Sequence, residues 1–366
     1  MAPEGSVLIT GGTGAIGRPL VESFLRDGAG VVVLVRDPLA ETVPGVQVVK
    51  GEIQQGDTLG LDPATCARLR RRVATIIHAA ALTRFDAPIE AARAVNVEGT
   101  RQVLGFAERC PNLERVCALS TVYVAGKRTG RVLEGELEHE RGFVNAYEHS
   151  KYDAEQLLRA SMSRLPIAVC RLSTAVGDSK TGTVHRLAAI HHAIRFLYHS
   201  LLPMLPGSAG SPVDLVATDY AVASIRYLSG EGFVPGRTWH VCAGADALGE
   251  AAVVDLAVEA FLRYRPAWRR RAIEKPAIVA LETFELFRRS VEAVADPALR
   301  ASVAVLAPFA PQLSFPKTFG DEQCQAALAG AGIVRPPIRD TLMNVVQYLI
   351  ETNWVSRDGA DGGAAA

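Results

Sequence analysis

Tyr147 and Lys151 are spaced for proton chemistry, because they stand four positions apart in Tyr147-Glu-His-Ser-Lys151. Residues i and i+4 of an α-helix lie on the same face, about 6 Å apart along the axis. An ammonium group at that position favours ionisation of the phenol, so we expect Lys151 to lower the pKa of Tyr147 from its ordinary value near 10. A tyrosine with a lowered pKa can act as an acid or a base near neutral pH.

A hydroxyl group is expected beside this pair. The apolar run 115–120 ends in Ser120 and Thr121, which places both hydroxyls at the carboxyl end of a predicted strand. Ligands of parallel α/β sheets bind in the crevice beyond the carboxyl ends of the strands. The pattern leaves both residues open as candidates, since one of them can instead bond the backbone at the strand end.

Residues 10–17 join an apolar strand to a predicted helix and are rich in glycine. In a dinucleotide-binding turn the first glycines allow the tight bend, the next lets the backbone approach a pyrophosphate, and the last lets the helix pack closely on the sheet. Free N–H groups at the helix N-terminus attract phosphates. The predicted cofactor contacts in this turn are Gly11, Gly12, Thr13, Gly14, Ala15, Ile16 and Gly17.

The end of the second predicted strand, Val33-Leu34-Val35-Arg36-Asp37, favours NADP over NAD. NAD enzymes usually carry an acidic residue there, which bonds the ribose 2′-hydroxyl. Here Val35 occupies that position, and Arg36 follows it as a possible partner for a 2′-phosphate. Arg18, just after the last glycine, could add a second contact. The alternative is that Arg36 is solvated and Asp37 binds the ribose of NAD.

Two further segments follow strands at the same predicted edge. Glu52 and Ile53 come after the third strand, where a side chain can contact the adenine. Ala79, Ala80 and Ala81 come after the fourth strand, where small side chains leave room for a cofactor lying across the sheet. We therefore expect both segments to contribute to the dinucleotide site.

The pattern of the first half predicts an α/β fold built on a doubly wound parallel sheet. Runs that are nearly continuous in Val and Ile are typical of strands covered on both faces, and their alternation with helical patterns indicates βαβ units. The predicted strands are 6–10, 31–35, 46–50, 73–78, 115–120, 166–171 and 238–242. The predicted helices between them are 15–27, 87–109 and 146–163.

The rest of the chain predicts a smaller, mostly helical C-terminal substrate lobe. Prolines separate helical patterns at 185–202, 218–229, 251–264, 276–294 and 338–353. We expect residues 1–178 to form the dinucleotide-binding domain, with 213–245 completing its sheet. Residues 179–212 and 246–356 are expected to form a lobe without a core of its own, and 357–366 a disordered tail. The apolar stretch 276–306 fits either a lid over an apolar substrate or an ordinary packed helix pair.

Composition excludes several classes of protein. The 366 residues carry 39 Lys plus Arg and 39 Asp plus Glu, so the basic excess of a nucleic-acid-binding protein is missing. The six cysteines form no CxxC pair, and His185, His192 and His199 are each about 10 Å apart along a helix, too far to share a metal. We expect no metal site, no signal peptide, no membrane span and a cytoplasmic setting.

Together these motifs resemble the extended short-chain dehydrogenase/reductases. The resemblance rests on Thr10–Gly17, Asn96-Val-Glu-Gly-Thr100, Ser120-Thr121 and Tyr147-xxx-Lys151, whose order and spacing match over residues 6–178. It implies a Rossmann-type domain, an NAD(P) cofactor and a Ser/Thr–Tyr–Lys triad, with the hydroxyl on Thr121. It also implies that Tyr147 and Lys151 contact the cofactor, and that Asn96 shapes the active-site helix and supports a proton relay.

Within that family the chain resembles the fatty acyl-CoA reductase and thioester reductase branch. The resemblance is carried by Arg171–Gly182, which includes Ser173 as an expected cofactor contact, and by Val213–Tyr220; 319–333 is a weaker match. Leu172 departs from the pattern, which usually has Pro after the arginine.

This branch implies an NADPH-dependent reductase of a carbonyl in a thioester, aldehyde or ketone. The substrate would be lipophilic or polyketide-like, either free or bound to a carrier, and the family often forms homodimers. A sugar-nucleotide epimerase or dehydratase using NAD, and a non-catalytic dinucleotide sensor, are the alternatives. Val122 and Tyr123 follow Thr121 where many such epimerases have an acidic pair.

Overall fold

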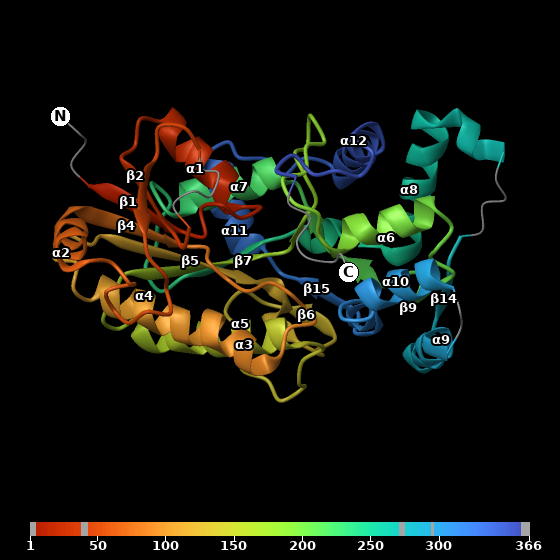
Figure 1. Cartoon of the computed structure of the whole chain (residues 1–366), viewed down its shortest axis with the longest axis horizontal. Helices are drawn as coiled ribbons and strands as arrows, with labels where there is room; N and C mark the ends of the chain where they lie inside the picture. Colours follow the sequence, from red (N-terminus) through yellow and green to blue (C-terminus); the bar gives the residue numbers. More distant parts are fainter. Residues whose placement is uncertain (1–4, 38–42, 271–274, 294–295, 360–366) are drawn as a thin grey trace.

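The computed structural model describes residues 5–37, 43–270, 275–293 and 296–359 and contains a seven-stranded parallel sheet (Figure 1). The strand order is β12-β7-β5-β4-β1-β2-β3. Its members are β1 (Ser6–Thr10), β2 (Val31–Val35), β3 (Gln47–Lys50), β4 (Val73–His78), β5 (Arg115–Thr121), β7 (Ile167–Leu172) and β12 (Thr238–Val241). All seven predicted strands are confirmed, and the Rossmann-type, doubly wound sheet with them.

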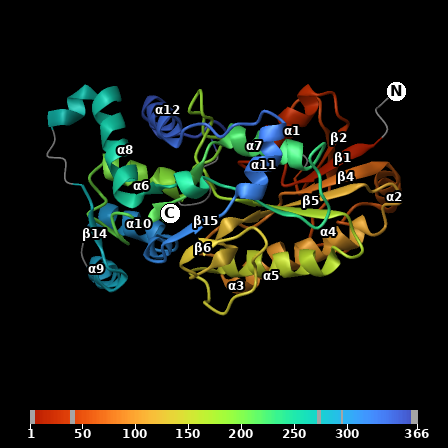
Figure 2. The same cartoon turned by 180° about the vertical axis from the view of Figure 1, so that it is seen from behind.

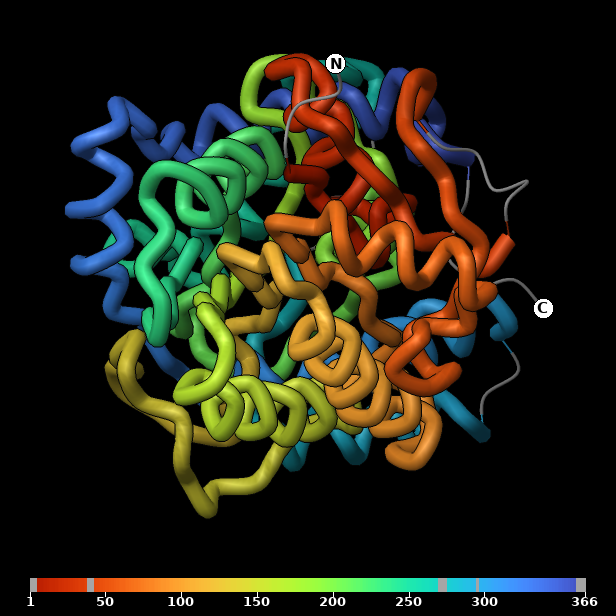
Figure 3. The backbone as a smooth tube through the Cα atoms, turned by 90° about the vertical axis from the view of Figure 1, so that its left-hand side faces the viewer, coloured from red at the N-terminus to blue at the C-terminus, as the bar shows by residue number. Residues whose placement is uncertain are grey.

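Helices cover both faces of this sheet, which explains why its strands are apolar throughout. Alternate residues of one strand enter opposite cores: Val7 and Ile9 pack with α1, whereas Leu8 packs on the other side with α4. Helices α1 (Gly17–Arg26), α7 (Thr218–Leu228) and α11 (Glu322–Gly330) belong to the first face. Helices α2 (Pro63–Arg72), α4 (Gly99–Ala107) and α5 (Ala146–Ser161) belong to the second; α4 and α5 lie side by side in Figure 3 as orange and yellow-green coils.

The helical pattern predicted over 87–109 is interrupted in the structure. It divides into α3 (Ile89–Arg93), a π-helical turn (Ala94–Glu98) and α4. The turn contains Asn96, and π-helical turns often occur at functional sites. Helix α2 was not predicted, although Asp62 accepts the Thr65 N–H as its N-cap at 3.0 Å and Pro63 begins the helix.

The C-terminal lobe has a hydrophobic core of its own, so the prediction that it lacks one is wrong. Buried side chains such as Phe261, Phe284 and Val345 pack together without any residue of the seven-stranded sheet. The lobe's helices are α6 (Ala189–Tyr198), α8 (Glu250–Tyr264), α9 (Leu281–Ala293), α10 (Pro297–Leu306) and α12 (Ile338–Glu351), which stand beside the sheet in Figure 2. Its strands are short pairs: β8 (Thr174–Ala175) with β11 (Leu215–Val216), β9 (Met204–Pro206) with β14 (Ala277–Val279), and β10 (Pro212–Val213) with β13 (Leu248–Gly249).

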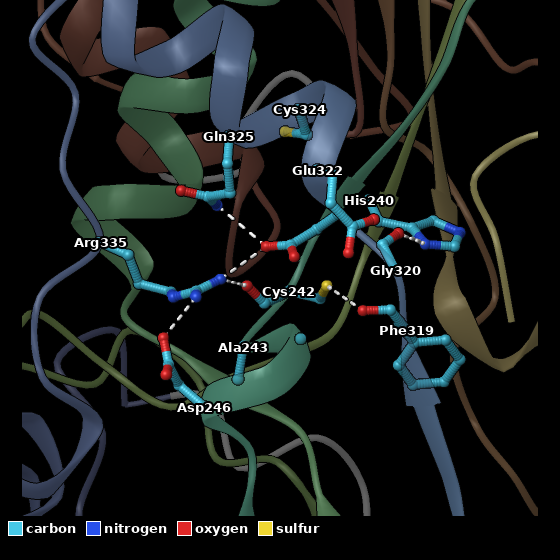
Figure 4. A network of polar contacts seen from close by, with 12 residues as sticks. His240, Cys242, Ala243, Asp246, Phe319, Gly320, Glu322, Cys324, Gln325 and Arg335 are labelled. Carbon is cyan, nitrogen blue, oxygen red and sulfur yellow. Dashed lines mark hydrogen bonds and ion pairs between the residues drawn. The ribbon is translucent and has the colours of Figure 1, made fainter. Parts of the chain in front are cut away.

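Residues 317–333 were expected in the lobe, but they pack against the first face of the seven-stranded sheet and contribute to a separate two-stranded sheet. Strand β15 (Lys317–Phe319) pairs in parallel with β6 (Gly130–Val132), and α11 adds Cys324 and Leu328 to the first-face core. Arg335 fastens this segment. Its guanidinium donates to the Cys242 carbonyl at 2.7 Å and to Asp246 at 2.6 Å, and Figure 4 shows these contacts beside α11.

The end of the described chain is fixed against the body of the protein. Arg357 donates its N–H to the Val184 carbonyl at 2.8 Å, and the Asp358 carboxylate lies 3.6 Å from Arg18 and 3.5 Å from His185. The prediction of a disordered tail is therefore wrong for residues 357–359, while 360–366 lie outside the described residues. None of the helices in the described ranges combines the length and apolarity that crossing a membrane requires.

A buried ion pair joins α5 to the sheet. Arg171 on β7 is 1% exposed, Glu155 on α5 is 0% exposed, and Arg171 Nη2 lies 2.6 Å from Glu155 Oε1. The same guanidinium donates to the Glu136 carbonyl at 2.8 Å, and the Ser120 hydroxyl donates to Glu155 at 2.8 Å. Because buried charges are costly unless they are paired, this network fixes how α5 sits on β5 and β7.

We expect Glu155→Gln to lower the free energy of unfolding by about 3 kcal/mol, because it leaves the Arg171 charge buried without a counter-charge. Urea unfolding measures the change. The control is Glu259→Gln on α8, which breaks an exposed pair with Arg339 on α12 and should cost no more than about 1 kcal/mol. Equal losses in the two variants would contradict the role assigned to the buried pair.

Candidate active site

The glycine turn between β1 and α1 has the tight geometry of a phosphate cradle. Gly11 has φ +73°, and a Cβ there would lie 2.5 Å from the backbone nitrogen of Ala80 after β4. A Cβ on Gly17 would collide with the Gly11 carbonyl oxygen. Any larger residue at these two positions would therefore force the turn away from the sheet.

The first turn of α1 suits an anionic ligand. No side chain caps its N-terminus, and no acidic residue lies in that turn. Thr13, Gly14, Ala15 and Ile16 retain exposed surface, whereas Gly12 is buried. Uncapped N–H groups with exposed backbone around them match the requirements of a pyrophosphate, so the residues present fit a dinucleotide.

The predicted adenine and ribose contacts lie along the neighbouring strand ends. Arg36 and Asp37 are exposed just beyond β2. Glu52 is half-buried and accepts a hydrogen bond from Gln55 at 3.0 Å, while Ile53 is buried in the second-face core. Arg18, expected at the cofactor, lies near both Asp358 and Glu22. The three alanines that follow β4, Ala79–Ala81, are half-buried. Ser173, the last predicted contact, donates its hydroxyl to the Asp214 carbonyl at 2.9 Å.

Thr121, rather than Ser120, is the hydroxyl beside Tyr147. Thr121 ends β5, and its hydroxyl lies near enough to the Tyr147 phenol to lower the pKa of that phenol. The Thr121 oxygen accepts the Tyr123 N–H at 3.2 Å. Ser120 points to the opposite side and donates to Glu155. The two candidates that the sequence left open are thus separated by the alternation of side chains along β5.

The prediction that Lys151 lowers the pKa of Tyr147 is wrong. The pKa of Tyr147 is raised to about 12. Burial is the main cause and the Glu148 carboxylate adds to it, while the Thr121 hydroxyl acts in the opposite direction. The Lys151 ammonium instead donates to the Leu119 carbonyl at 2.8 Å. Burial lowers the pKa of Lys151 to about 8, while the charge of Glu155 acts in the opposite direction. Loss of hydration around the phenol is the largest effect. Tyr147 therefore carries its proton at neutral pH.

Asn96 fixes the start of α5. Its amide nitrogen donates to the Leu82 carbonyl at 3.0 Å and to the Ser150 hydroxyl at 2.8 Å, and its oxygen accepts the Leu82 N–H at 2.7 Å. Ser150 in turn donates to the Tyr147 carbonyl at 3.0 Å. Asn96 thus ties the turn that carries Tyr147 to the loop after β4.

An apolar cavity of about 190 Å³ lies near the triad, although none of Thr121, Tyr147 and Lys151 lines it. Phe85, whose ring meets that of Tyr147 edge-on at 5.5 Å, lines it together with Phe309 and aliphatic side chains of α6 and α8. None of the described residues within 276–306 lines this cavity, and Phe284 and Leu306 pack in the lobe core. This favours the packed helix pair over the lid.

Two ionisable groups that the sequence did not single out also line the cavity. Burial raises the pKa of Glu148 to about 7, while the hydrogen bond from the Val144 N–H at 3.0 Å and the charge of Lys317 lower it. Burial lowers the pKa of Lys317 to about 8, and the charge of Glu148 raises it. Glu148 lies inside the Tyr147–Lys151 motif, but nothing in that motif shows that it faces the cavity. Within the described ranges, no three His, Cys, Asp or Glu side chains form a metal-binding group.

Comparison with known proteins supports the assignment of the fold and the family. The family model described as "Male sterility protein", an NAD-binding family, matches residues 37–225, more than half of the chain. The chain therefore belongs to this NAD(P)-binding reductase family, within the extended short-chain dehydrogenase/reductases and their thioester reductase branch.

The curated relatives are longer than this chain. The glycine betaine reductase ATRR of Emericella nidulans is 26% identical over 269 residues, which cover 64% of this chain and 21% of the relative. The fatty acyl-CoA reductase wat of Drosophila melanogaster is 22% identical over 273 residues, which cover 60% and 53%. The chain thus spans between about a fifth and about half of these proteins.

A solved structure supports the fold over nearly the whole chain. The terminal R domain from the myxalamid PKS-NRPS biosynthetic pathway superposes with a TM-score of 0.78 at 24% identity. The superposition covers 96% of this chain and 92% of that domain, so the C-terminal lobe shares the fold as well.

The raised pKa of Glu148 makes stability depend on pH. The folded protein holds this proton more tightly than the unfolded chain, because the folded pKa is about 7 against the ordinary 4.5. The wild type should therefore lose up to about 3 kcal/mol relative to Glu148→Gln as the pH rises from about 4.5 to about 7. Unfolding across this range tests it, with the exposed Glu138→Gln as control; parallel profiles for wild type and Glu148→Gln would contradict the burial of this carboxyl.

Proposed function

We propose that the chain is an NADPH-dependent reductase that acts on the carbonyl of an acyl thioester, aldehyde or ketone. The observation that carries the proposal is the placement of Tyr147 beside Thr121 and against Phe85, which lines an apolar cavity. The fatty acyl-CoA reductases among the relatives and the similar terminal R domain support the choice of an acyl thioester.

The parts of the dinucleotide would bind at the carboxyl ends of different strands. The glycine turn and the N-terminus of α1 would hold the pyrophosphate, Ala79–Ala81 would leave space beside β4, and Ser173 would border the far end. Arg36 would pair with the 2′-phosphate. Arg18 would make a second contact with this phosphate after its ion pair with Asp358 breaks. When bound, the dinucleotide supplies the hydride.

The triad would supply the proton and orient the carbonyl. The Thr121 and Tyr147 hydroxyls would both donate to the carbonyl oxygen, and Tyr147 would transfer its proton as negative charge develops there. A phenol with a pKa of about 12 is fully protonated at neutral pH, as an acid for reduction must be. Lys151, held at the Leu119 carbonyl, would bind the ribose hydroxyls.

The cavity would hold the acyl chain of the substrate. Aromatic and aliphatic side chains form most of its wall, so it would bind an apolar chain by removing it from water. A sugar nucleotide would find few hydrogen-bonding groups there, which disfavours the epimerase and dehydratase alternatives. The reacting carbonyl would lie at the end that Phe85 and Glu148 share with Tyr147.

We expect Tyr147→Phe to lower turnover by at least about a hundredfold, because it removes the proton donor and leaves the cofactor cradle intact. NADPH consumption with an acyl thioester measures turnover, and NADPH fluorescence measures cofactor binding, which should remain near normal. Tyr152→Phe on the same helix is the control, since Tyr152 lies outside the triad and only accepts a hydrogen bond from Gln156. Wild-type activity in Tyr147→Phe would refute this role.

We expect Arg36→Leu to weaken NADPH binding by about ten- to a hundredfold and to leave NADH binding almost unchanged, because only NADPH carries the 2′-phosphate. Titration of each cofactor into the protein measures both affinities. Arg72→Leu controls for the loss of one exposed positive charge at the end of α2. A wild type that binds NADH more tightly than NADPH, or an Arg36→Leu variant with unchanged NADPH affinity, would show that Arg36 does not bind the 2′-phosphate.

A further inference from the structure

A carboxyl group without a hydrogen-bond partner is buried in the wall of the apolar cavity. Glu250 is the first residue of α8, lines the cavity and is 2% exposed. Neither of its carboxyl oxygens has a hydrogen-bond partner among the residues that the structure describes. Burial raises the pKa of Glu250 to about 8, and the nearby Ser208 N–H, whose own hydrogen bond goes to the Ser211 hydroxyl at 3.2 Å, lowers it.

The backbone around Glu250 is arranged to hold the side chain in this position. The Glu250 N–H donates to the Ser211 carbonyl at 2.9 Å, and the next N–H, of Ala251, donates to the Ala209 carbonyl at 3.1 Å. The carboxyl packs against Gly207, which has φ +144°, and a Cβ at that glycine would collide with Glu250 Oε2. A residue with a side chain at position 207 would therefore displace the carboxyl.

The structural role of an acidic residue at a helix start does not account for this carboxyl. An acidic residue in the first turn of a helix usually bonds a free backbone N–H or interacts with the helix dipole. Helix α8 has no side-chain cap, and the Glu250 carboxyl accepts none of its N–H groups. Burying an unpaired polar group costs free energy, so a partner that enters the cavity would be favoured.

The two glutamates in the cavity wall, Glu148 and Glu250, differ in their partners. Glu148, next to Tyr147 in the chain, accepts the Val144 N–H and lies in the field of Lys317. Glu250 belongs to the lobe and lines the cavity from the same helix as Val253 and Val254. The Glu250 carboxyl is therefore left for a group of the substrate other than the reacting carbonyl.

We propose that Glu250 is a specificity-determining residue that binds a hydrogen-bond donor, such as an amide N–H, an amine or a hydroxyl, on the acyl chain of the substrate. The proposal rests on the reductase function and narrows its substrate class from a plain alkyl chain to a functionalised one. A plain chain leaves the carboxyl unpaired, whereas a donor at the matching position satisfies it.

Matched acyl thioesters test the proposal. The first series of thioesters carries an amide N–H at successive positions along the acyl chain. The second series carries the N-methyl amide at the same positions, and the third has a methylene chain of equal length. Further thioesters carry a hydroxyl or an amine. The wild type should prefer one donor-bearing member over its methylene match by about ten- to a hundredfold in kcat/KM. The N-methyl compound should lose that preference, because it lacks the donor.

Two substitutions separate recognition from folding. Glu250→Leu should abolish the preference and improve kcat/KM for the methylene chain, while Glu250→Gln, which keeps an acceptor oxygen, should retain most of the preference. Glu259→Gln on the exposed side of α8 should behave as wild type. A wild type that never favours a donor, or a Glu250→Leu variant that keeps the preference, would overturn the proposal.

Binding measurements distinguish this failure from failure of the reductase function. Thioether analogues of the same chains cannot be reduced, so calorimetry reports their affinity whatever the reaction is. Absence of turnover with every thioester and with the matching aldehydes and ketones would refute the reductase function, while the affinities still test Glu250. Equal affinities of the donor and methylene thioethers for the wild type would refute the role of Glu250 alone.

Discussion

The contact between the Tyr147 phenol and Thr121 is the interaction on which the site depends. Burial of the phenol keeps it protonated, and the Thr121 hydroxyl gives it a partner at the end of β5. The contact requires α5 to be held in one position along the sheet. Three interactions hold it there from different elements: the Asn96–Ser150 hydrogen bond, the Lys151–Leu119 hydrogen bond and the Glu155–Arg171 ion pair.

The lobe completes the site from the other side. Because it has its own core, it forms a cavity wall that does not depend on the sheet. The connection between the two parts runs through β6 with β15 and through Arg335, whose bonds join 317–335 to Cys242 and Asp246. The polar triad and the apolar cavity are thereby held near each other, with Phe85 in contact with Tyr147 and in the cavity wall.

The sequence predicts those parts of the structure that depend on local pattern. Continuous Val and Ile runs identify all seven strands, and the glycine spacing identifies the turn at β1, because both follow from backbone requirements of neighbouring residues. Long-range packing sets the rest. The pKa of Tyr147 rises because of burial that no i,i+4 spacing reveals, and α11 joins the sheet through Cys324 and Leu328. The unpaired carboxyl of Glu250 is visible only once α8 is placed against Gly207.

A crystal structure of the protein with bound NADPH tests the central claim most directly. The account predicts that the nicotinamide ring lies between the glycine turn and the Tyr147 phenol, with the Lys151 ammonium on the ribose and the Arg36 guanidinium on the 2′-phosphate. A dinucleotide bound away from the 10–17 turn, or a Tyr147 phenol directed away from the nicotinamide, would contradict it.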